Sequence, residues 1–308
     1  MGHNYSSFSH NSQRQIMEKI TKEYVKTLFK KRDRNANKGT FGQSVIIGGS
    51  KNFVGAPQFA NFSAEKILVS LGEASMRSGC GTSYLAVPDF LAQNIYSSAL
   101  YSAIFSLSSK DGFIVYNKDE IDTLMKRGTA FAIGMGMGMG DSENIVRHIL
   151  DEGNQNIVID ADALSGTKNI TDFKGRCILT PHIGEMEKIS EIDKHIILKN
   201  PEKIALEYAK LTNSVVVLKG SPKSYISDGN EVFENTTGNV RLAKGGSGDI
   251  LSGIIAGLLA WGMPILDAAK ASTYILGRCA EISTVNEYSS LPTDIIALIP
   301  KVLDEVME

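Results

Sequence analysis

The sequence contains few cysteines and no hydrophobic run long enough to suggest a membrane protein. Its three cysteines, Cys80, Cys177 and Cys279, lie far apart and form no C-x-x-C pair, which argues against a disulfide framework or a zinc site. The longest apolar stretch, Ile250 to Trp261, is too short to cross a bilayer. The first fifteen residues also lack the apolar core of a secretory signal. We therefore expect a cytoplasmic protein.

An excess of charge of either sign is absent as well. The 308 residues include 32 basic and 34 acidic side chains, for a formal net charge of −2. This balance favours neither a nucleic acid nor an anionic membrane as a partner. With 43% hydrophobic residues the chain can bury a large core. No internal repeat and no linker rich in proline, glycine or serine divides it.

The two familiar phosphate-binding motifs are also missing. No G-x-x-x-x-G-K-[ST] sequence occurs, and the glycine-rich stretch Gly134 to Gly140 fails as a G-x-G-x-x-G motif because Met139 and Asp141 stand where the sixth-position glycine is required. Alternate glycines, Gly136 among them, still permit close approach of the backbone to a ligand. The alternative is a flexible loop with methionines packed beneath it. We favour a ligand loop, because a predicted helix starts directly after it.

Apolar strands alternate with helical segments along most of the chain. Strands are predicted at 44–47, 82–87, 129–133, 156–159, 177–180 and 214–218, and helices at 16–29, 56–76, 142–152 and 201–211. This alternation is typical of an α/β fold with a mainly parallel sheet covered by helices on both faces. The first 15 residues are predicted to be a disordered tail, with the 16–29 helix on the surface.

Unusual residues follow four of these strands. They are the glycine-rich loop, Asp160 to Asp162, Thr180 to Glu185, and Lys219 with Gly220. In open α/β sheets, ligands bind in the crevice beyond the carboxyl ends of the strands. The four strand ends are therefore predicted to face one site.

The segment Lys244 to Asp249 carries the strongest single signal. Three glycines and a serine stand before an apolar helix, so backbone N–H groups and the helix dipole converge on one point and form an anion hole. A carboxylate at its rim, Asp249, would repel a bound phosphate, which suggests a base beside a transferring phosphoryl group. The alternative is a glycine-rich turn in which Asp249 is merely the N-cap.

The other strand-end residues admit two interpretations each. Asp160 and Asp162 could hold Mg²⁺ through waters or orient a polar substrate, or else form a solvated helix entry with Asp162 as the cap. His182 and Glu185 are three residues apart and share a face if a helix begins there, which favours a substrate or phosphate contact over metal ligation. The segment Lys219 to Lys223 is either a nucleotide-phosphate contact or a surface turn.

In this order the motifs resemble the carbohydrate-kinase-like family of NAD(P)H-hydrate dehydratases, within the ribokinase-like superfamily. The resemblance runs from about Asn37 to the C-terminus. It rests on NKGTFG at 37–42, GGS and GAP within 48–57, RSGCG at 77–81, the glycine loop, DADAL at 160–164, TPHIGE at 180–185, VLKG at 217–220 and TGNVRLAKGGSGDILSG at 237–253.

The resemblance implies a ribokinase-like three-layer sandwich over residues 37–308, preceded by a tail and surface helix at 1–36. The larger members carry an additional N-terminal epimerase domain, for which this chain has too few residues before Asn37, so it looks like the stand-alone dehydratase. The implied reaction uses ADP or ATP, with Mg²⁺, to remove water from hydrated NADH or NADPH. A homo-oligomer is also implied.

Site residues are implied by the same resemblance. Asp249 would be the catalytic base. The remaining assignments are an anion hole of Gly246, Ser247 and Gly248; a nucleotide site of Lys219, Gly220, Ser221, Pro222, Lys223 and Gly248; substrate contacts from Ala56, Gly136, His182 and Asp249; and Glu185 as the residue that organises Mg²⁺ and phosphate.

Two other functions fit the catalytic motif. A small-molecule kinase of the same superfamily, acting on a sugar, a vitamin precursor or a thiazole alcohol, would use Asp249 and the anion hole equally well. A nucleotide-binding sensor without turnover is the third possibility. The chain also departs from the family pattern at Met135 and Ile183, where prolines are usual, and at Arg241, where glycine is usual.

Overall fold

The structure, a computed structural model, describes residues 17–51, 61–96 and 99–308, with side chains of the helix 61–78 described from residue 69 onward. A ten-stranded sheet has the order β1-β12-β11-β10-β9-β8-β7-β2-β3-β4, and β5 and β6 form a separate pair. The strands are β1 (Glu18–Lys19), β2 (Gln43–Ile47), β3 (Thr82–Pro88), β4 (Ser102–Leu107), β5 (Ser109–Lys110), β6 (Phe113–Ile114), β7 (Ala130–Ile133), β8 (Asn156–Ile159), β9 (Cys177–Leu179), β10 (Val215–Leu218), β11 (Ser224–Ser227) and β12 (Val232–Asn235).

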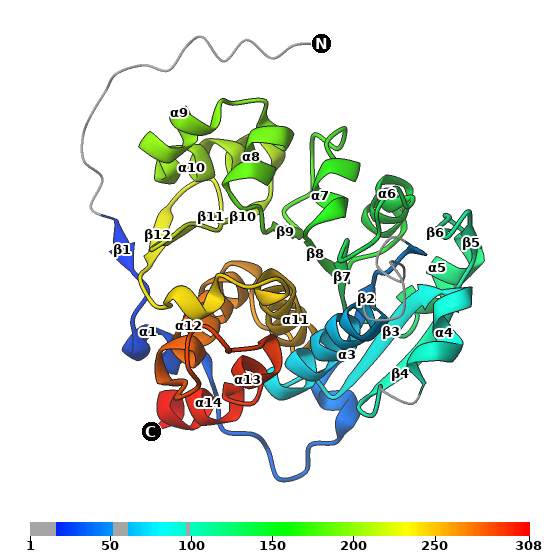
Figure 1. Cartoon of the computed structure of the whole chain (residues 1–308), viewed down its shortest axis with the longest axis horizontal. Coiled ribbons are helices and arrows are strands. Elements are labelled where there is room, and N and C mark those ends of the chain that lie inside the picture. The colour runs from blue at the N-terminus through cyan, green and yellow to red at the C-terminus, as the bar shows by residue number, and fades with distance from the viewer. Residues whose placement is uncertain (1–16, 52–60, 97–98) are drawn as a thin grey trace.

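Helices cover both faces of this sheet (Figure 1). On one face lie α1 (Lys22–Leu28), α3 (Asn61–Ser78), α4 (Asp89–Ile95), α11 (Ser247–Ala260), α12 (Ile265–Ile282), α13 (Pro292–Ile296) and α14 (Ile299–Met307). On the other lie α5 (Lys118–Met125), α6 (Ser142–Glu152), α7 (Asp162–Gly166), α8 (Ile183–Ser190), α9 (Lys194–Lys199) and α10 (Pro201–Thr212). Two short 3₁₀ helices, η1 (Lys38–Phe41) and η2 (Val240–Leu242), complete the described elements.

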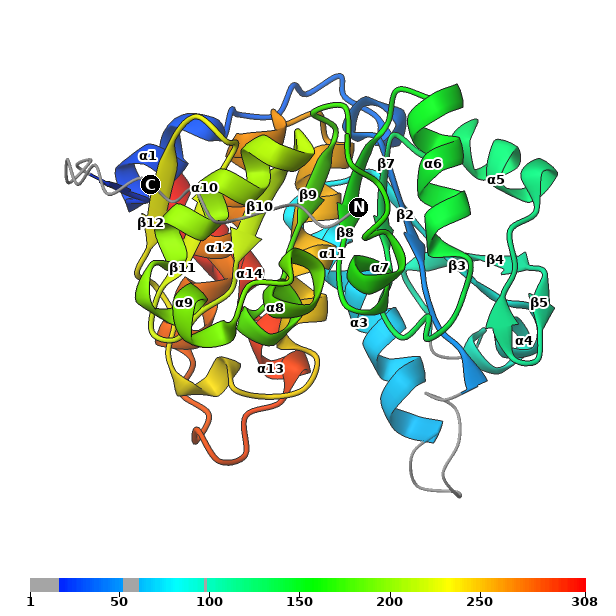
Figure 2. The same ribbon diagram turned by 90° about the horizontal axis from the view of Figure 1, so that it is seen from above.

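Seven neighbouring strands, from β10 to β4, run parallel, whereas β11 is antiparallel to both of its neighbours. Side chains alternate between the two faces of a strand. In β2, Ile46 therefore joins the core under α11 while Val45 and Ile47 join the core under α5 to α10. The view from above in Figure 2 shows α7 to α10 lying over the strands from β8 to β12.

The central helix α11 is buried from Ile250 to Ala260. It packs closely on α3, because Gly253 and Gly257 leave no side chain in the way. A Cβ atom at Gly253 would lie 2.8 Å from the carbonyl oxygen of Leu71. α11 also packs on β2, β7 and β8, and its first turns lie beside Asp160, which directly follows β8.

The α/β architecture and the mainly parallel sheet predicted from the sequence are confirmed. The prediction of one helix over 16–29 is wrong, because Glu18 and Lys19 pair with β12 and the helix begins only at Lys22. Thr21 ends the extended segment, since its hydroxyl oxygen accepts the Tyr24 N–H at 3.2 Å as an N-cap. The predicted disordered tail lies outside the described residues.

None of the helices in the described part of the chain combines the length and the hydrophobicity needed to span a bilayer.

Candidate active site

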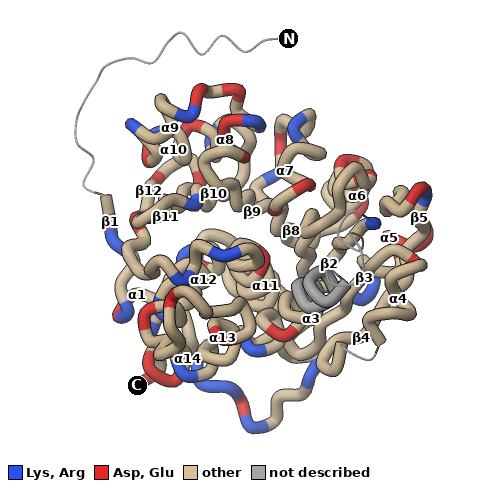
Figure 3. Tube along the Cα trace, in the orientation of Figure 1, with Lys and Arg blue, Asp and Glu red and all other residues tan. Residues whose placement is uncertain are grey.

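The four predicted strand ends do meet at one edge of the sheet. β7, β8, β9 and β10 are adjacent and parallel, so the segments that follow them leave the sheet side by side. The segments after β9 and β10 are joined directly, because the Lys219 N–H donates to the Pro181 carbonyl at 2.8 Å. Figure 3 shows acidic residues on this side, at the start of α11 and around α7.

The beginning of α11 has the features of an anion site. Gly246 is the N-cap, with a left-handed φ of 95° that suits glycine, and Asp249 is the third residue of the helix. The alternative in which Asp249 is the N-cap is therefore wrong. Within the described residues, the amides of Gly246, Gly248 and Asp249 have no hydrogen-bond acceptor, whereas the Ser247 N–H donates to the Lys244 carbonyl at 3.2 Å. The three unpaired amides are available to an anion.

A buried ion pair lies immediately below this helix start. The Lys219 ammonium is 3.0 Å from Oδ1 of Asp160, and the Ser252 hydroxyl donates to Oδ2 at 2.8 Å. Burial by itself would raise the pKa of Asp160, but the charge of Lys219 and hydrogen bonds from Lys219, Ser252 and Thr180 outweigh it and lower the pKa. Asp160 is therefore an anion with its partners in place. It is not a solvated helix entry.

Asp249 lies in the electrostatic field of this cluster. Burial raises its pKa first, and the negative charges of Asp160, Glu185 and Asp162 raise it further, against the opposing effect of Lys219. The resulting pKa is about 7. A carboxylate with a pKa near neutrality can both accept and return a proton at physiological pH, which is the property required of a general base.

His182 and Glu185 form the start of α8. Nδ1 of His182 accepts the N–H of Gly184 at 3.0 Å and of Glu185 at 3.2 Å, and the Glu185 carboxylate accepts the His182 N–H at 2.8 Å. This reciprocal capping box fixes both side chains. Because Nδ1 is an acceptor here, the ring proton of neutral His182 is on Nε2, which lies 3.5 Å from Glu185. The sequence prediction that the two side chains share one face is confirmed.

The glycine loop has the methionine packing that the alternative interpretation predicted. Met135 and Met137 are buried beneath it, while Met139 is 81% exposed. Gly136 and Gly138 have positive φ angles, of 69° and 59°. The loop is anchored rather than free, because the Gly138 N–H donates to Oδ2 of Asp162 at 2.8 Å. Asp162 therefore anchors this loop, whereas Ala161 occupies the N-cap position of α7.

The segment after β10 separates its two lysines. Lys219 points into the cluster of Asp160 and Glu185, with its ammonium 3.8 Å from the latter. Lys223 instead forms an ion pair of 2.6 Å with Glu234 of β12. Between them lie Gly220, Ser221 and Pro222, with a cis Ser221–Pro222 peptide bond. The predicted substrate contact Ala56 lies outside the described residues.

A family model described as NAD(P)H-hydrate dehydratase matches residues 44–301. The chain belongs to this dehydratase family. It is 31% identical to the ADP-dependent (S)-NAD(P)H-hydrate dehydratase of Bacillus subtilis, over 92% of this chain and 96% of that protein. It is also 31% identical to the bifunctional NAD(P)H-hydrate repair enzyme of Dictyoglomus turgidum, where 92% of this chain covers only 55% of the relative.

The fold agrees with this family. The crystal structure of the ADP/ATP-dependent NAD(P)H-hydrate dehydratase from Bacillus subtilis, co-crystallised with ATP and Mg²⁺, superposes with a TM-score of 0.78. The two chains are 25% identical, and the alignment covers 94% of this chain and 99% of that one. The ribokinase-like layering expected from the motifs is thus observed.

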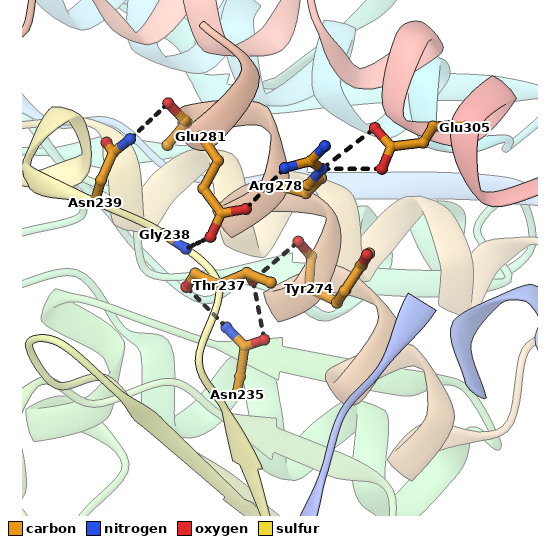
Figure 4. Close-up of polar contacts among 9 residues, drawn as sticks. Asn235, Thr237, Gly238, Asn239, Tyr274, Arg278, Glu281 and Glu305 are labelled. Atoms are coloured by element: carbon orange, nitrogen blue, oxygen red, sulfur yellow. Dashed lines mark hydrogen bonds and ion pairs between the residues drawn. The ribbon is translucent and has the colours of Figure 1, made fainter. Parts of the chain in front are cut away.

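Within this family fold, the segment that leads from β12 to the anion site is held by α12 (Figure 4). The Thr237 hydroxyl donates to the Tyr274 carbonyl at 3.2 Å, and the Gly238 N–H donates to Glu281 at 3.0 Å. Arg278 in turn pairs with Glu281 at 3.1 Å and Glu305 at 3.0 Å. These contacts fix the start of the segment that runs from Gly238 to Gly246, and Gly246 is the N-cap of α11.

Sequence reasoning missed two residues that the dehydratase fold brings to the cluster. The Ser252 hydroxyl donates to Asp160 at 2.8 Å. Thr180 helps to lower the pKa of Asp160, while its hydroxyl donates to the Ile159 carbonyl at 3.4 Å. Arg241, where the family pattern has glycine, donates to the Val285 carbonyl at 2.8 Å. The spacing of Ser252, three residues after Asp249 on one helix, is a signal that could have found it. Thr180 offered no comparable signal. Among the described residues, no group of three acidic, histidine or cysteine side chains has the arrangement of a metal site.

Proposed function

We propose that this protein removes water from hydrated NADH or NADPH in a reaction driven by ADP or ATP. The observation that carries the proposal is Asp249, a partly buried carboxylate with a pKa near 7, placed beside three unpaired amides at a helix start. The names of the relatives support the substrate and the nucleotide. The dehydratase region assigned to this activity is residues 37–308.

Phosphorylation explains why a kinase-like site serves an elimination. Asp249 accepts the proton of the ring hydroxyl as its oxygen attacks the terminal phosphorus of the nucleotide, and the bond from that phosphorus to the bridging oxygen breaks. The unpaired amides of Gly246 and Gly248, with Ser247 beside them, stabilise the charge on the transferring group. The nucleotide leaves with one phosphate fewer.

The second step breaks the carbon–oxygen bond. Hydroxide is a poor leaving group, but the phosphate ester departs with help from the lone pair of the ring nitrogen. Loss of a proton from the adjacent ring carbon then restores the dihydronicotinamide. The role of the protein in both steps is to hold the base and the amide donors in place before the substrates arrive.

The remaining site assignments follow the same proposal. The main chain of Lys219 to Pro222, with Gly248 opposite, contacts the nucleotide. Gly248 lies close to this segment, since a Cβ atom at Gly248 would be 3.1 Å from the Lys219 ammonium. Lys223, at the end of this segment, contributes through its main chain, because its ammonium is paired with Glu234. Gly136, His182 and Asp249 contact the hydrate, as does Ala56. Nε2 of His182 is the group of that residue left to donate.

The nucleotide requires Mg²⁺ for its phosphate chemistry. Asp160 is engaged by Lys219 and Ser252, so the chemistry of the donor set does not fit a metal cage made by the protein alone. Glu185 fits better as a residue that receives a metal already bound to phosphate. Such a metal would neutralise charge on the phosphate oxygens. The protein is further proposed to be cytoplasmic and to form a homo-oligomer.

The test combines the hydrate, the nucleotide and two readouts. NADHX and NADPHX are each incubated with the protein and ADP or ATP, and the absorbance of restored dihydronicotinamide is followed together with released phosphate. Equal yields of both products are expected. Phosphate transfer to a sugar or to a thiazole alcohol, with no gain in absorbance, would indicate a kinase instead, and nucleotide binding without either product would indicate a sensor.

Asp249→Asn tests the base. We expect kcat to fall by about 10²- to 10⁴-fold, the usual contribution of a general base, while nucleotide binding is retained. Asp304→Asn, at an exposed position on α14, is the matched control and should keep full activity. If Asp249→Asn turns over at the rate of this control, Asp249 has another role.

A further inference from the structure

A cavity of about 460 Å³ opens beside the catalytic cluster. It lies between the glycine loop, α7 and α8, which are neighbours above the strand ends (Figure 1). Its lining includes Asp162 and Glu185, the two carboxylates whose charges raise the pKa of Asp249. The cavity therefore borders the acidic cluster around Asp249, and Glu185 belongs to both.

The acidic groups of this cavity already have donors. Asp162 accepts the N–H of Gly138 at 2.8 Å. Glu185 accepts the His182 N–H at 2.8 Å and lies 3.8 Å from the Lys219 ammonium. Within the described residues, neither carboxylate pairs with Lys188.

Lys188 is the one cationic side chain in the described lining. It is exposed, and no hydrogen bond or ion pair to it occurs within the described residues. It stands three residues after Glu185 on α8, so both side chains project from the same face of that helix. The cavity thus has a cation whose charge is not used by the protein.

A dinucleotide hydrate brings at least two negative charges into this space. With its reacting ring at Asp249, the rest of the molecule extends in this proposal into the neighbouring cavity, where the carboxylates of Asp162 and Glu185 repel its phosphates. An unpaired ammonium at the same wall offsets that repulsion and forms charge-assisted hydrogen bonds to phosphate oxygens.

We propose that Lys188 binds a phosphate group of the hydrated dinucleotide in this cavity and thereby sets the affinity for that substrate. This inference rests on the proposed dehydratase function and names a residue for the part of the substrate remote from the chemistry. Because the contact is made away from the reacting ring, it contributes equally to the ground state and the transition state. Its loss changes KM and leaves kcat nearly unaltered.

The test compares Lys188→Met with Lys188→Arg and with Lys199→Met, a matched control at an exposed lysine on α9. We expect Lys188→Met to raise KM for the hydrate about tenfold, as for loss of one charge-assisted contact, with kcat and the KM for ADP and ATP unchanged. Lys188→Arg should restore most of the affinity. An equal rise for NADHX and NADPHX assigns the contact to the diphosphate, and a rise for NADPHX alone assigns it to the 2′-phosphate.

Three results would overturn the proposal: an unchanged KM for both hydrates, a raised KM for the nucleotide alone, or the same change in Lys199→Met. Wild-type turnover separates these outcomes from failure of the proposed function. A second readout needs no turnover. Binding of NADPH, followed by its fluorescence, should weaken with added salt more steeply in the wild type than in Lys188→Met.

Discussion

Two lysine–carboxylate pairs flank the same short segment and differ in the exposure of the lysine and in the charges nearby. Lys219 meets Asp160 at 3.0 Å, and the Lys219 side chain is 21% exposed. Lys223 meets Glu234 at 2.6 Å, and the Lys223 side chain is 46% exposed. The two carboxylates are both buried. The shorter pair is the one in contact with solvent. Distance alone would therefore rank the two pairs in the wrong order.

Burial and neighbouring charges decide the difference. Water screens the ammonium of Lys223, whereas the charge of Asp160 acts through a poorly screened interior on Asp249. The same interior raises the cost of leaving Asp160 without its partner. The inner pair thus controls both the stability of the strand ends and the proton affinity of the proposed base. The outer pair, Lys223 with Glu234, joins the residue before β11 to β12.

Breaking the inner pair gives the largest expected effect. Lys219→Met should lower the free energy of unfolding by about 3 to 5 kcal/mol at pH 7, the range for removing one partner of a buried pair. Since Lys219 holds the pKa of Asp160 below its usual value, the stabilisation is present at neutral pH and is lost as the pH falls. Urea unfolding at several pH values measures both the loss in the free energy of unfolding and its dependence on pH.

A second substitution controls that measurement. The double variant Lys219→Met with Asp160→Asn removes the stranded charge and should be more stable at pH 7 than Lys219→Met alone. A double variant with the summed loss of the two single ones would show that the pair is not coupled.

The pH profile of the wild type comes next in size. Asp249 must be ionised to act as a base, so kcat/KM should rise with pH to a plateau above about 7 and fall about tenfold for each pH unit below.

The stability of the folded protein should change with pH in the opposite direction to kcat/KM. Because the folded pKa exceeds the ordinary value of 3.8, stability from protonated Asp249 is present below about pH 4 and is lost as the pH rises to about 7. Asp249→Asn should abolish this dependence, as thermal unfolding at each pH will show.

A smaller and more specific effect is expected from Glu185→Gln. Glutamine keeps an oxygen for the capping box of α8 but removes a negative charge that raises the pKa of Asp249. The ascending limb of the pH profile should therefore move to lower pH. A limb that stays in place, with the plateau rate preserved, would mean that Glu185 does not act on Asp249 through its charge.

The smallest effect is expected from breaking the outer pair. Lys223→Met should leave the pH profile unaltered and change the KM for ADP or ATP less than twofold, because the Lys223 ammonium is held by Glu234 and is screened by water. Initial rates over a range of nucleotide concentrations decide this. A large rise in that KM would show that the Lys223 ammonium leaves Glu234 for the nucleotide, and the two pairs would then be functionally alike.

Local sequence patterns predicted much of the fold and part of the candidate site. Runs such as Val215 to Leu218 are apolar at every position, which predicts a strand buried on both faces, and β10 is buried throughout. The spacing of His182 and Glu185 predicted their common face. The helix over 16–29 was not predictable correctly, because the pairing of Glu18 and Lys19 with β12 depends on a strand more than 200 residues away.

The sequence by itself determined that a glycine-rich helix start carries Asp249 and that four strand ends carry polar residues, because turns, caps and strand periodicity are local properties. It also carried the family motifs. Only the tertiary structure decided that Lys219 rather than Lys223 enters the cluster, that Lys219 and Ser252 satisfy Asp160, and that Asp249 has a pKa near 7. Those outcomes depend on burial and on charges brought together from distant segments, and no local pattern encodes them.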